Sequence, residues 1–233
     1  MLNELQINPA FNRKDPIYVL AFRKLNDEVK GYASSKYISA SWKSSFIRSL
    51  SARPIFYVEG LGLGDENEGR KCDACNRTGH PATFVVQFGG KAYSKETLDE
   101  IDNDHDEDDD DDDDDDNGGD DASVDSQGRS IPSEKTSWYV GRFCKGNAET
   151  AHALIHWKHA LNDWVIETLK GEGHLTPQKL AQREDWSKKK RSEYANGIVD
   201  GWWESKEIKG LYRDFKNTLE VARQGKTGRW RTQ

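Results

Sequence analysis

The spacing of apolar and polar positions predicts a chain that is mainly helical. Asp15 can cap a helix that has Pro16 at its first position, and the apolar residues that follow predict a helix over residues 16–32. A second apolar stripe predicts a helix over residues 41–52, which stops before Pro54. Its members are Trp42, Phe46, Ile47 and Leu50.

The C-terminal half carries three further helical patterns. The clearest runs from Asn147, a possible cap, to Lys170, with a broad apolar stripe. Thr176 and Pro177 repeat the signal of a cap followed by proline, and we expect a helix from there to Tyr194. The last predicted helix covers residues 205–223.

Strand patterns are confined to the middle of the chain. The stretch "ATFVVQFGGKAYS" is rich in β-formers and holds a Gly-Gly turn, and residues 136–143 predict another strand. The run "PIFYVEGLGLG", residues 54–64, is short, apolar and punctuated by glycine, which favours a buried turn. The predicted fold class is therefore α+β and mainly α-helical, with a small β-hairpin.

Charge is distributed very unevenly. Of 41 acidic residues, 15 fall in residues 102–121, which contain no lysine or arginine, and the rest of the chain holds 26 acidic and 34 basic residues. Such an acidic run repels itself and cannot form a core, so we expect a disordered insert, either a plain loop or an arm for basic partners. The predicted organisation is a flexible N-terminus (1–12), one globular domain (13–101 and 122–223) interrupted by the insert, and a basic tail (224–233).

Composition excludes several classes of protein. No run of apolar residues is long enough to cross a membrane, and the N-terminus lacks the pattern of a secretory signal. Three cysteines among 233 residues argue against a fold built on disulfides and for a reducing compartment.

Two of these cysteines form the motif Cys72-x2-Cys75. A redox pair of this spacing needs a helix directly behind it, whereas "NRTGHP" follows here and indicates a turn. A zinc knuckle is the better interpretation, and it supplies two of the four ligands that a structural zinc ion needs.

The remaining ligands must come from elsewhere in the chain. His152 and His156 are four residues apart on a predicted helix, so they can share one ion, and with the two cysteines they form the first-ranked set. Cys144 is the best substitute for one histidine. His80, His159 and His174 are weaker candidates. The alternative for the histidine pair is a hydrogen-bonded position in the core.

A catalytic zinc ion needs an open coordination position and a placed base. The spacings H-E-x-x-H and H-x-E with P-C-x-x-C are absent from the sequence, and Glu149, one turn before His152, is the only base suggested by position. We therefore expect zinc to be structural and the protein not to be an enzyme, with a zinc hydrolase as the weakest alternative.

Three stretches stand out together: "NRKDPIYVLAFRKLNDEV", "CDACNRTGHPATFVVQFGGKAYSKETL" and "GRFCKGNAETAHALIHWKHALNDWV". From about Phe11 to Leu169 the chain resembles the domain-of-unknown-function family DUF4211, a eukaryotic and chiefly fungal family. The resemblance implies a metal site that uses Cys72, Cys75, Cys144, His152 and His156. It also implies a nuclear, chromatin-linked setting and no established activity.

The function expected from these features is a zinc-stapled module that binds protein partners in the nucleus, such as histones or chromatin factors. Trp202, Trp203 and Trp230 lie among charged residues and are interface candidates. The alternative is a nucleic-acid-binding domain that uses the basic run at residues 188–191 and the basic tail. No membrane and no small-molecule substrate is expected.

Overall fold

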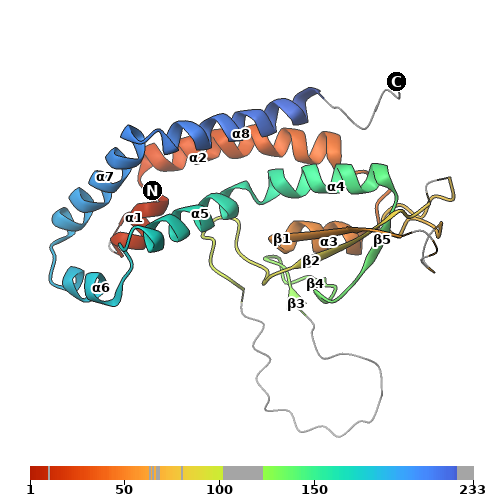
Figure 1. The fold of residues 1–233 in the computed structure, drawn as a ribbon, viewed down its shortest axis with the longest axis horizontal. Helices are drawn as coiled ribbons and strands as arrows, with labels where there is room; N and C mark the ends of the chain where they lie inside the picture. Colours follow the sequence, from red (N-terminus) through yellow and green to blue (C-terminus); the bar gives the residue numbers. More distant parts are fainter. Residues whose placement is uncertain are drawn as a thin grey trace, which may run out of the picture. The chain divides into compact units, whose positions relative to one another are not determined.

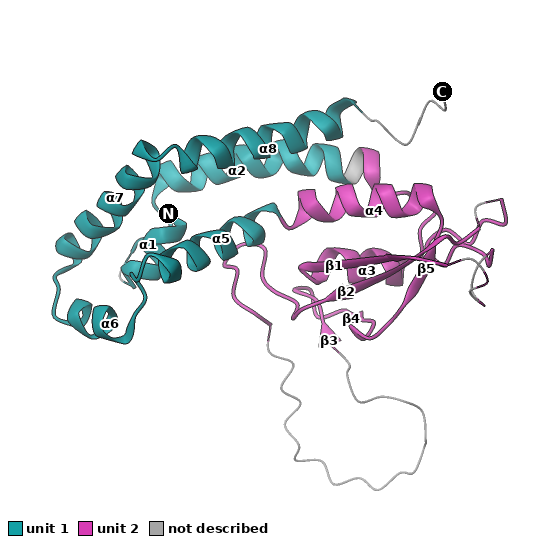
Figure 2. Ribbon diagram, in the orientation of Figure 1, with its two compact units in different colours: residues 1–35, 157–226 teal, residues 36–156, 227–233 magenta. Residues whose placement is uncertain are grey.

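The computed structural model describes residues 1–9, 11–62, 64, 66, 69–79, 81–101 and 123–224. The acidic insert, most of the basic tail, Trp230 and His80 lie outside this range. Whereas the sequence predicts one globular domain, the chain groups into two compact units (Figure 2). The first unit holds residues 1–35 and 157–226, and the described residues of the second fall within 36–156.

The described part of the chain is an α+β structure dominated by helices, which confirms the predicted class (Figure 1). Within it, no helix is long and apolar enough to cross a membrane. Within its described residues, the first unit contains helices and the loops that join them, and no strands. Its helices are α1 (Leu2–Ile7), α2 (Pro16–Tyr32), α5 (Trp157–Gly171), α6 (Pro177–Glu184), α7 (Lys188–Glu204) and α8 (Glu207–Gln224).

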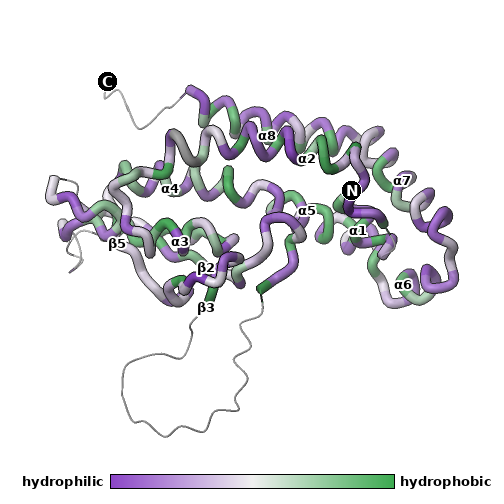
Figure 3. Tube along the Cα trace, turned by 180° about the vertical axis from the view of Figure 1, so that it is seen from behind, coloured by the Kyte–Doolittle hydropathy of each residue, from purple (hydrophilic) through white to green (hydrophobic). Residues whose placement is uncertain are grey.

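In the first unit, the two N-terminal helices pack against helices from the C-terminal half of the chain. Helix α1 contacts α5 and α7, and α2 lies beside α8 (Figure 1). Hydrophilic and hydrophobic positions alternate along α8 (Figure 3), as its helical spacing predicts. The N-terminus was predicted to be flexible, but Leu2 and Ile7 are buried and Asn3 Nδ2 donates to the carbonyl oxygen of Ala195 at 2.9 Å.

The second unit has a three-stranded antiparallel sheet in the order β1-β2-β5. A second sheet of two short strands, β3 and β4, lies after the insert. A π-helical turn (Ala33–Tyr37) leads into the unit. Its other elements are α3 (Ser44–Ala52), β1 (Ile55–Gly60), β2 (Phe84–Gly89), β3 (Ser123–Val124), β4 (Ser130–Ile131), β5 (Trp138–Val140) and α4 (Arg142–Ile155).

Helices α3 and α4 cover the same face of the larger sheet. The ring of Phe46 on α3 contacts Phe88 and Trp138, at centroid distances of 5.4 and 5.3 Å. On α4, the ring of His152 lies 5.3 Å from that of Phe56. This aromatic layer is the core of the unit, and Trp42, whose ring lies 5.1 Å from that of Phe46, connects it to Cys144 in the first turn of α4.

Three elements differ from the sequence-based predictions. Residues 55–60, predicted as a buried turn, form strand β1 because they pair along their length with β2 from Ile55↔Gly89 to Gly60↔Phe84. The helix predicted over 147–170 is two helices, with a break at His156. The helix predicted to end at Tyr194 is also two, because Ser187 starts α7 by accepting a hydrogen bond from Lys190 N at 3.3 Å.

Candidate metal site

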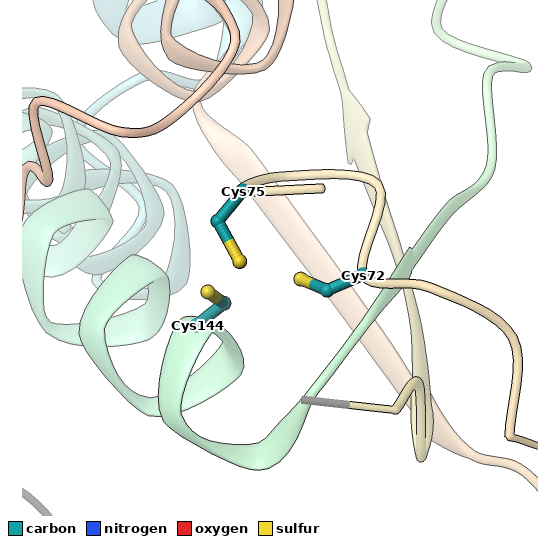
Figure 4. Close-up of side chains that lie close together, drawn as sticks. All are labelled: Cys72, Cys75 and Cys144. Atoms are coloured by element: carbon teal, nitrogen blue, oxygen red, sulfur yellow. The ribbon is translucent and has the colours of Figure 1, made fainter. Parts of the chain in front are cut away.

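Cys72, Cys75 and Cys144 come together in the second unit (Figure 4). Their sulfur atoms all lie within 4.8 Å of one another, and all three are free thiols. Figure 4 shows the three sulfurs close together, two from the loop and one from α4. Four sulfurs around tetrahedral zinc at about 2.3 Å would be about 3.8 Å apart, which lies within the 4.8 Å limit on the observed separations.

The loop that holds Cys72 and Cys75 is fixed by backbone hydrogen bonds. Asn76 N donates to the oxygen of Cys72 at 2.7 Å, in a turn closed by the left-handed conformation of Asn76 (φ 55°). Ala74 O accepts from Lys43 N at 2.8 Å. The loop is therefore held in shape from within and from the segment before α3.

Asp73 ties the same loop to strand β5. Its backbone N–H donates to Tyr139 O at 2.7 Å, and its Oδ2 accepts from Tyr139 N at 2.9 Å. Its Oδ1 pairs with Arg70 at 3.0 Å. Strand β5 leads directly into α4. The two hydrogen bonds between Asp73 and Tyr139 therefore set the distance between the loop and Cys144.

Cys144 lies in the first turn of α4, not at the end of a strand as the sequence suggested, because β5 ends at Val140. Trp42 Nε1 donates to Cys144 Sγ at 3.3 Å. The N-terminus of a helix favours a thiolate. This side chain therefore has both a hydrogen-bond donor and a helix terminus beside it.

The surroundings of Cys72 and Cys144 shift the pKa values of these two thiols in opposite directions. The Cys144 thiol hydrogen bond and the amides of Gly141, Cys75 and Ala74 lower the pKa of Cys72 to about 5, against the opposing effect of burial. The hydrogen bond to Cys72, together with burial, raises the pKa of Cys144. The two shifts run in opposite directions and have one cause in common, the hydrogen bond between Cys72 and Cys144.

His152 and His156, the two histidines of the first-ranked ligand set, have other hydrogen-bond partners in the structure. His152 Nε2 donates to Arg53 O and His156 Nε2 donates to Leu50 O, both at 3.0 Å. His156 Nδ1 accepts from Tyr93 Oη at 2.7 Å and lies 3.1 Å from Lys95 Nζ. The pair takes the core role that the sequence left as the alternative, and Cys144 takes the place beside the loop.

The histidines that the sequence ranked lower as metal ligands lie in the first unit or outside the described residues. His159 pairs with Asp163 at 2.9 Å, and His174 pairs with Glu172 at 3.1 Å, both in the first unit. Within the described residues, the three cysteines are the group of side chains spaced for a metal ion. A structural zinc ion would need a fourth ligand, and His80, the remaining sequence candidate, lies outside the described residues.

Comparisons with known proteins agree with the sequence-based resemblance. The chain is 24% identical over 153 residues to "Uncharacterized protein C17H9.06c" of Schizosaccharomyces pombe, which is 66% of this chain and 20% of that protein. The chain thus corresponds to about a fifth of that relative. No solved structure matches the chain.

A family model described as "Domain of unknown function (DUF4211)" matches residues 1–98. The match includes Cys72 and Cys75, and it ends before Cys144. The expectation from the sequence was a longer stretch, to about Leu169. Residues 1–98 of the chain are therefore similar to the DUF4211 family.

Proposed function

We propose that the second unit is a structural zinc module that holds a protein-binding surface in shape. The convergence of Cys72, Cys75 and Cys144 is the observation that carries this proposal. These residues come from a loop and from a helix that are more than 60 residues apart in sequence, so an ion between them would cross-link the unit. The sulfur donors favour zinc over hard cations such as magnesium or calcium.

The acidic groups nearest in sequence to the ligands support a structural ion. Both oxygens of Asp73 are engaged by Arg70 and by the backbone of Tyr139. Glu149, the base suggested by position, accepts from Lys145 Nζ at 2.7 Å on the surface of α4. Neither carboxylate is a free general base, which supports a binding role over hydrolysis.

Strand β1 offers a surface for a protein partner. It lies at an edge of the larger sheet, and Ile55, Tyr57 and Val58 are 42%, 54% and 39% exposed. In an antiparallel pair, the backbone N–H and C=O of successive residues point alternately toward the partner strand and away from it. Leu61 N donates to Thr83 O, so Leu61 points toward the chain of β2. The backbone groups of Phe56, Val58 and Gly60 therefore point away from β2. Outward backbone groups beside apolar side chains suit the addition of an extended segment from a partner.

A nuclear setting is part of this proposal. Lys188, Lys189 and Lys190 are exposed at the start of α7, where the helix dipole disfavours positive charge. An exposed basic run of this kind is a common import signal. Changing the three lysines to glutamine should move a fluorescent fusion of the chain out of the nucleus.

The test of the proposed function compares protein capture from nuclear extract by four samples: the wild-type chain, the same chain treated with a zinc chelator, and two variants of Val58. Wild type is expected to retain a reproducible set of proteins, and treatment with a zinc chelator should abolish their retention. Val58→Pro should abolish it too, because proline removes an outward N–H but leaves the pairing with β2 intact. Val58→Thr keeps that N–H and serves as the control; equal capture by all samples would refute the proposal.

A further inference from the structure

An open cavity of about 620 Å³ lies in the first unit, where the segment after α5 meets α7. Its size is typical of sites that bind small ligands or single side chains. It is remote in sequence from the cysteine loop and belongs to the other unit. The zinc module therefore does not explain it.

A chain of hydrogen bonds fixes the polar wall of this cavity. Glu172 Oε1 accepts from Trp202 Nε1 at 2.9 Å, and Glu172 Oε2 lies 3.1 Å from His174 Nε2. His174 Nδ1 lies 2.7 Å from the hydroxyl of Tyr194. One consistent arrangement has His174 donating to Glu172 and accepting from Tyr194, so the carboxylate is clamped on both oxygens and keeps two acceptor positions.

The segment that carries Glu172 and His174 is itself held in place. Arg183, which is buried, donates from its guanidinium to His174 O at 2.6 Å. His174 N also donates to Leu169 O at 2.8 Å, at the end of α5. The polar wall is therefore preorganised before any ligand enters.

Helix α7 leaves space on the other side of the cavity. Gly197 and Gly201 line it, four residues apart and hence on one face of the helix. A Cβ atom at either glycine would meet nothing within 4 Å. Ile198 and Trp202 add apolar surface between and beyond them.

The charge of the lining indicates what the cavity accepts. Glu172 and Glu193 both line it, and among the residues that the structure describes no lysine or arginine does. A carboxylate that is held in place can accept charge-assisted hydrogen bonds from a cationic group. Tyrosine and tryptophan rings beside it can attract the same cation through their faces. We propose that this cavity binds an arginine or lysine side chain of a basic peptide.

This inference goes beyond the proposed zinc module and does not rest on it. A chain that binds no zinc could still bind a basic peptide here, and the reverse also holds. The two proposals can therefore fail separately, and zinc content measured on the same samples distinguishes the two failures.

The experiment titrates the full chain with capped pentapeptides that differ only in the central residue. Arginine and lysine are compared with their neutral counterparts, citrulline and acetyl-lysine, while the indole N–H signal of Trp202 is followed by NMR. The signal is assigned with Trp202→Phe. We expect one or both cationic peptides to bind at least about tenfold tighter than their neutral counterparts, and the two arms show which side chain is preferred.

Two variants locate the site and one controls for charge. Glu172→Gln should weaken binding of the cationic peptide about tenfold, and Gly201→Leu should abolish binding by filling the cavity while keeping both carboxylates. Glu167→Gln makes the same charge change on an exposed side chain of α5 and should bind as wild type. Equal binding of neutral and cationic peptides, or wild-type affinity in Gly201→Leu, would overturn the inference even if Glu172→Gln does not fold.

Discussion

His156 Nε2 lies 3.0 Å from the carbonyl oxygen of Leu50, in the last turn of α3. Helix ends leave carbonyl groups without intrahelical partners, and here a side chain from another helix supplies the missing donor. His152 does the same for Arg53 O, one residue beyond the helix. The i, i+4 pair thus joins α3 to α4 in the core of the second unit.

Replacing His156 with phenylalanine should destabilise the chain by about 1–3 kcal/mol, because Leu50 O would stay buried without its donor. The change also leaves the Tyr93 hydroxyl without its acceptor. Urea unfolding, followed by tryptophan fluorescence, measures the effect. His159→Gln is the matched control, since His159 pairs with Asp163 near the surface and its loss should cost about 0–1 kcal/mol. An equal effect of both variants would contradict the role assigned to His156.

Stability should also depend on pH through His152. Burial, and to a smaller extent the charge of Lys95, lower the pKa of His152 to about 4. Between about pH 4 and its ordinary value of 6.5 the unfolded chain binds more protons, so stability is full above pH 6.5 and falls as the pH drops toward 4. The loss should be up to roughly 3 kcal/mol.

His152→Gln should remove this part of the pH dependence. Urea unfolding of wild type and variant at pH 7.5, 6 and 5 gives the difference in slope. The carboxylates and any metal ligands titrate in both proteins, so their contributions to the pH dependence cancel in the comparison. Identical slopes would show that His152 does not stay neutral in the folded chain.

Trp42 should affect metal affinity without being a ligand. Its indole donates to Cys144 Sγ, and partners of this kind typically change metal affinity by about 10–100-fold when they are removed. Trp42→Phe keeps an aromatic ring against Phe46, so the fold should persist. Competition with a chromophoric chelator measures the zinc affinity, and Trp203→Phe, at an exposed position, is the control that should leave it unchanged.

Local signals in the sequence predicted several elements closely. Asp15 followed by Pro16 set the start of α2, and the observed helix, Pro16–Tyr32, has the predicted bounds. The breaks at His156 and before Ser187 were missed because the apolar spacing continues across a gap of one to three residues. Strand β1 was missed because its pairing with β2 depends on contacts distant in sequence.

The site shows the same limit. The spacing of Cys72 and Cys75 indicated a knuckle, but the choice between Cys144 and the histidines depended on where β5 ends and α4 begins. Placing that boundary a few residues too late put Cys144 at the end of a strand, ahead of the helix. The spacing of His152 and His156 suits a shared ion and a pair of helix-end caps equally well, and only the position of α3 distinguishes them.

The most direct test of the central claim is the zinc content of chain purified without added metal. Wild type, His152→Gln and His156→Gln should each carry about one zinc ion, whereas Cys72→Ser, Cys75→Ser and Cys144→Ser should each lose it. His80→Ala in the same series tests whether the fourth ligand comes from the cysteine loop. Zinc-free wild type, or zinc that is retained in Cys144→Ser and lost in the histidine variants, would contradict the site described here.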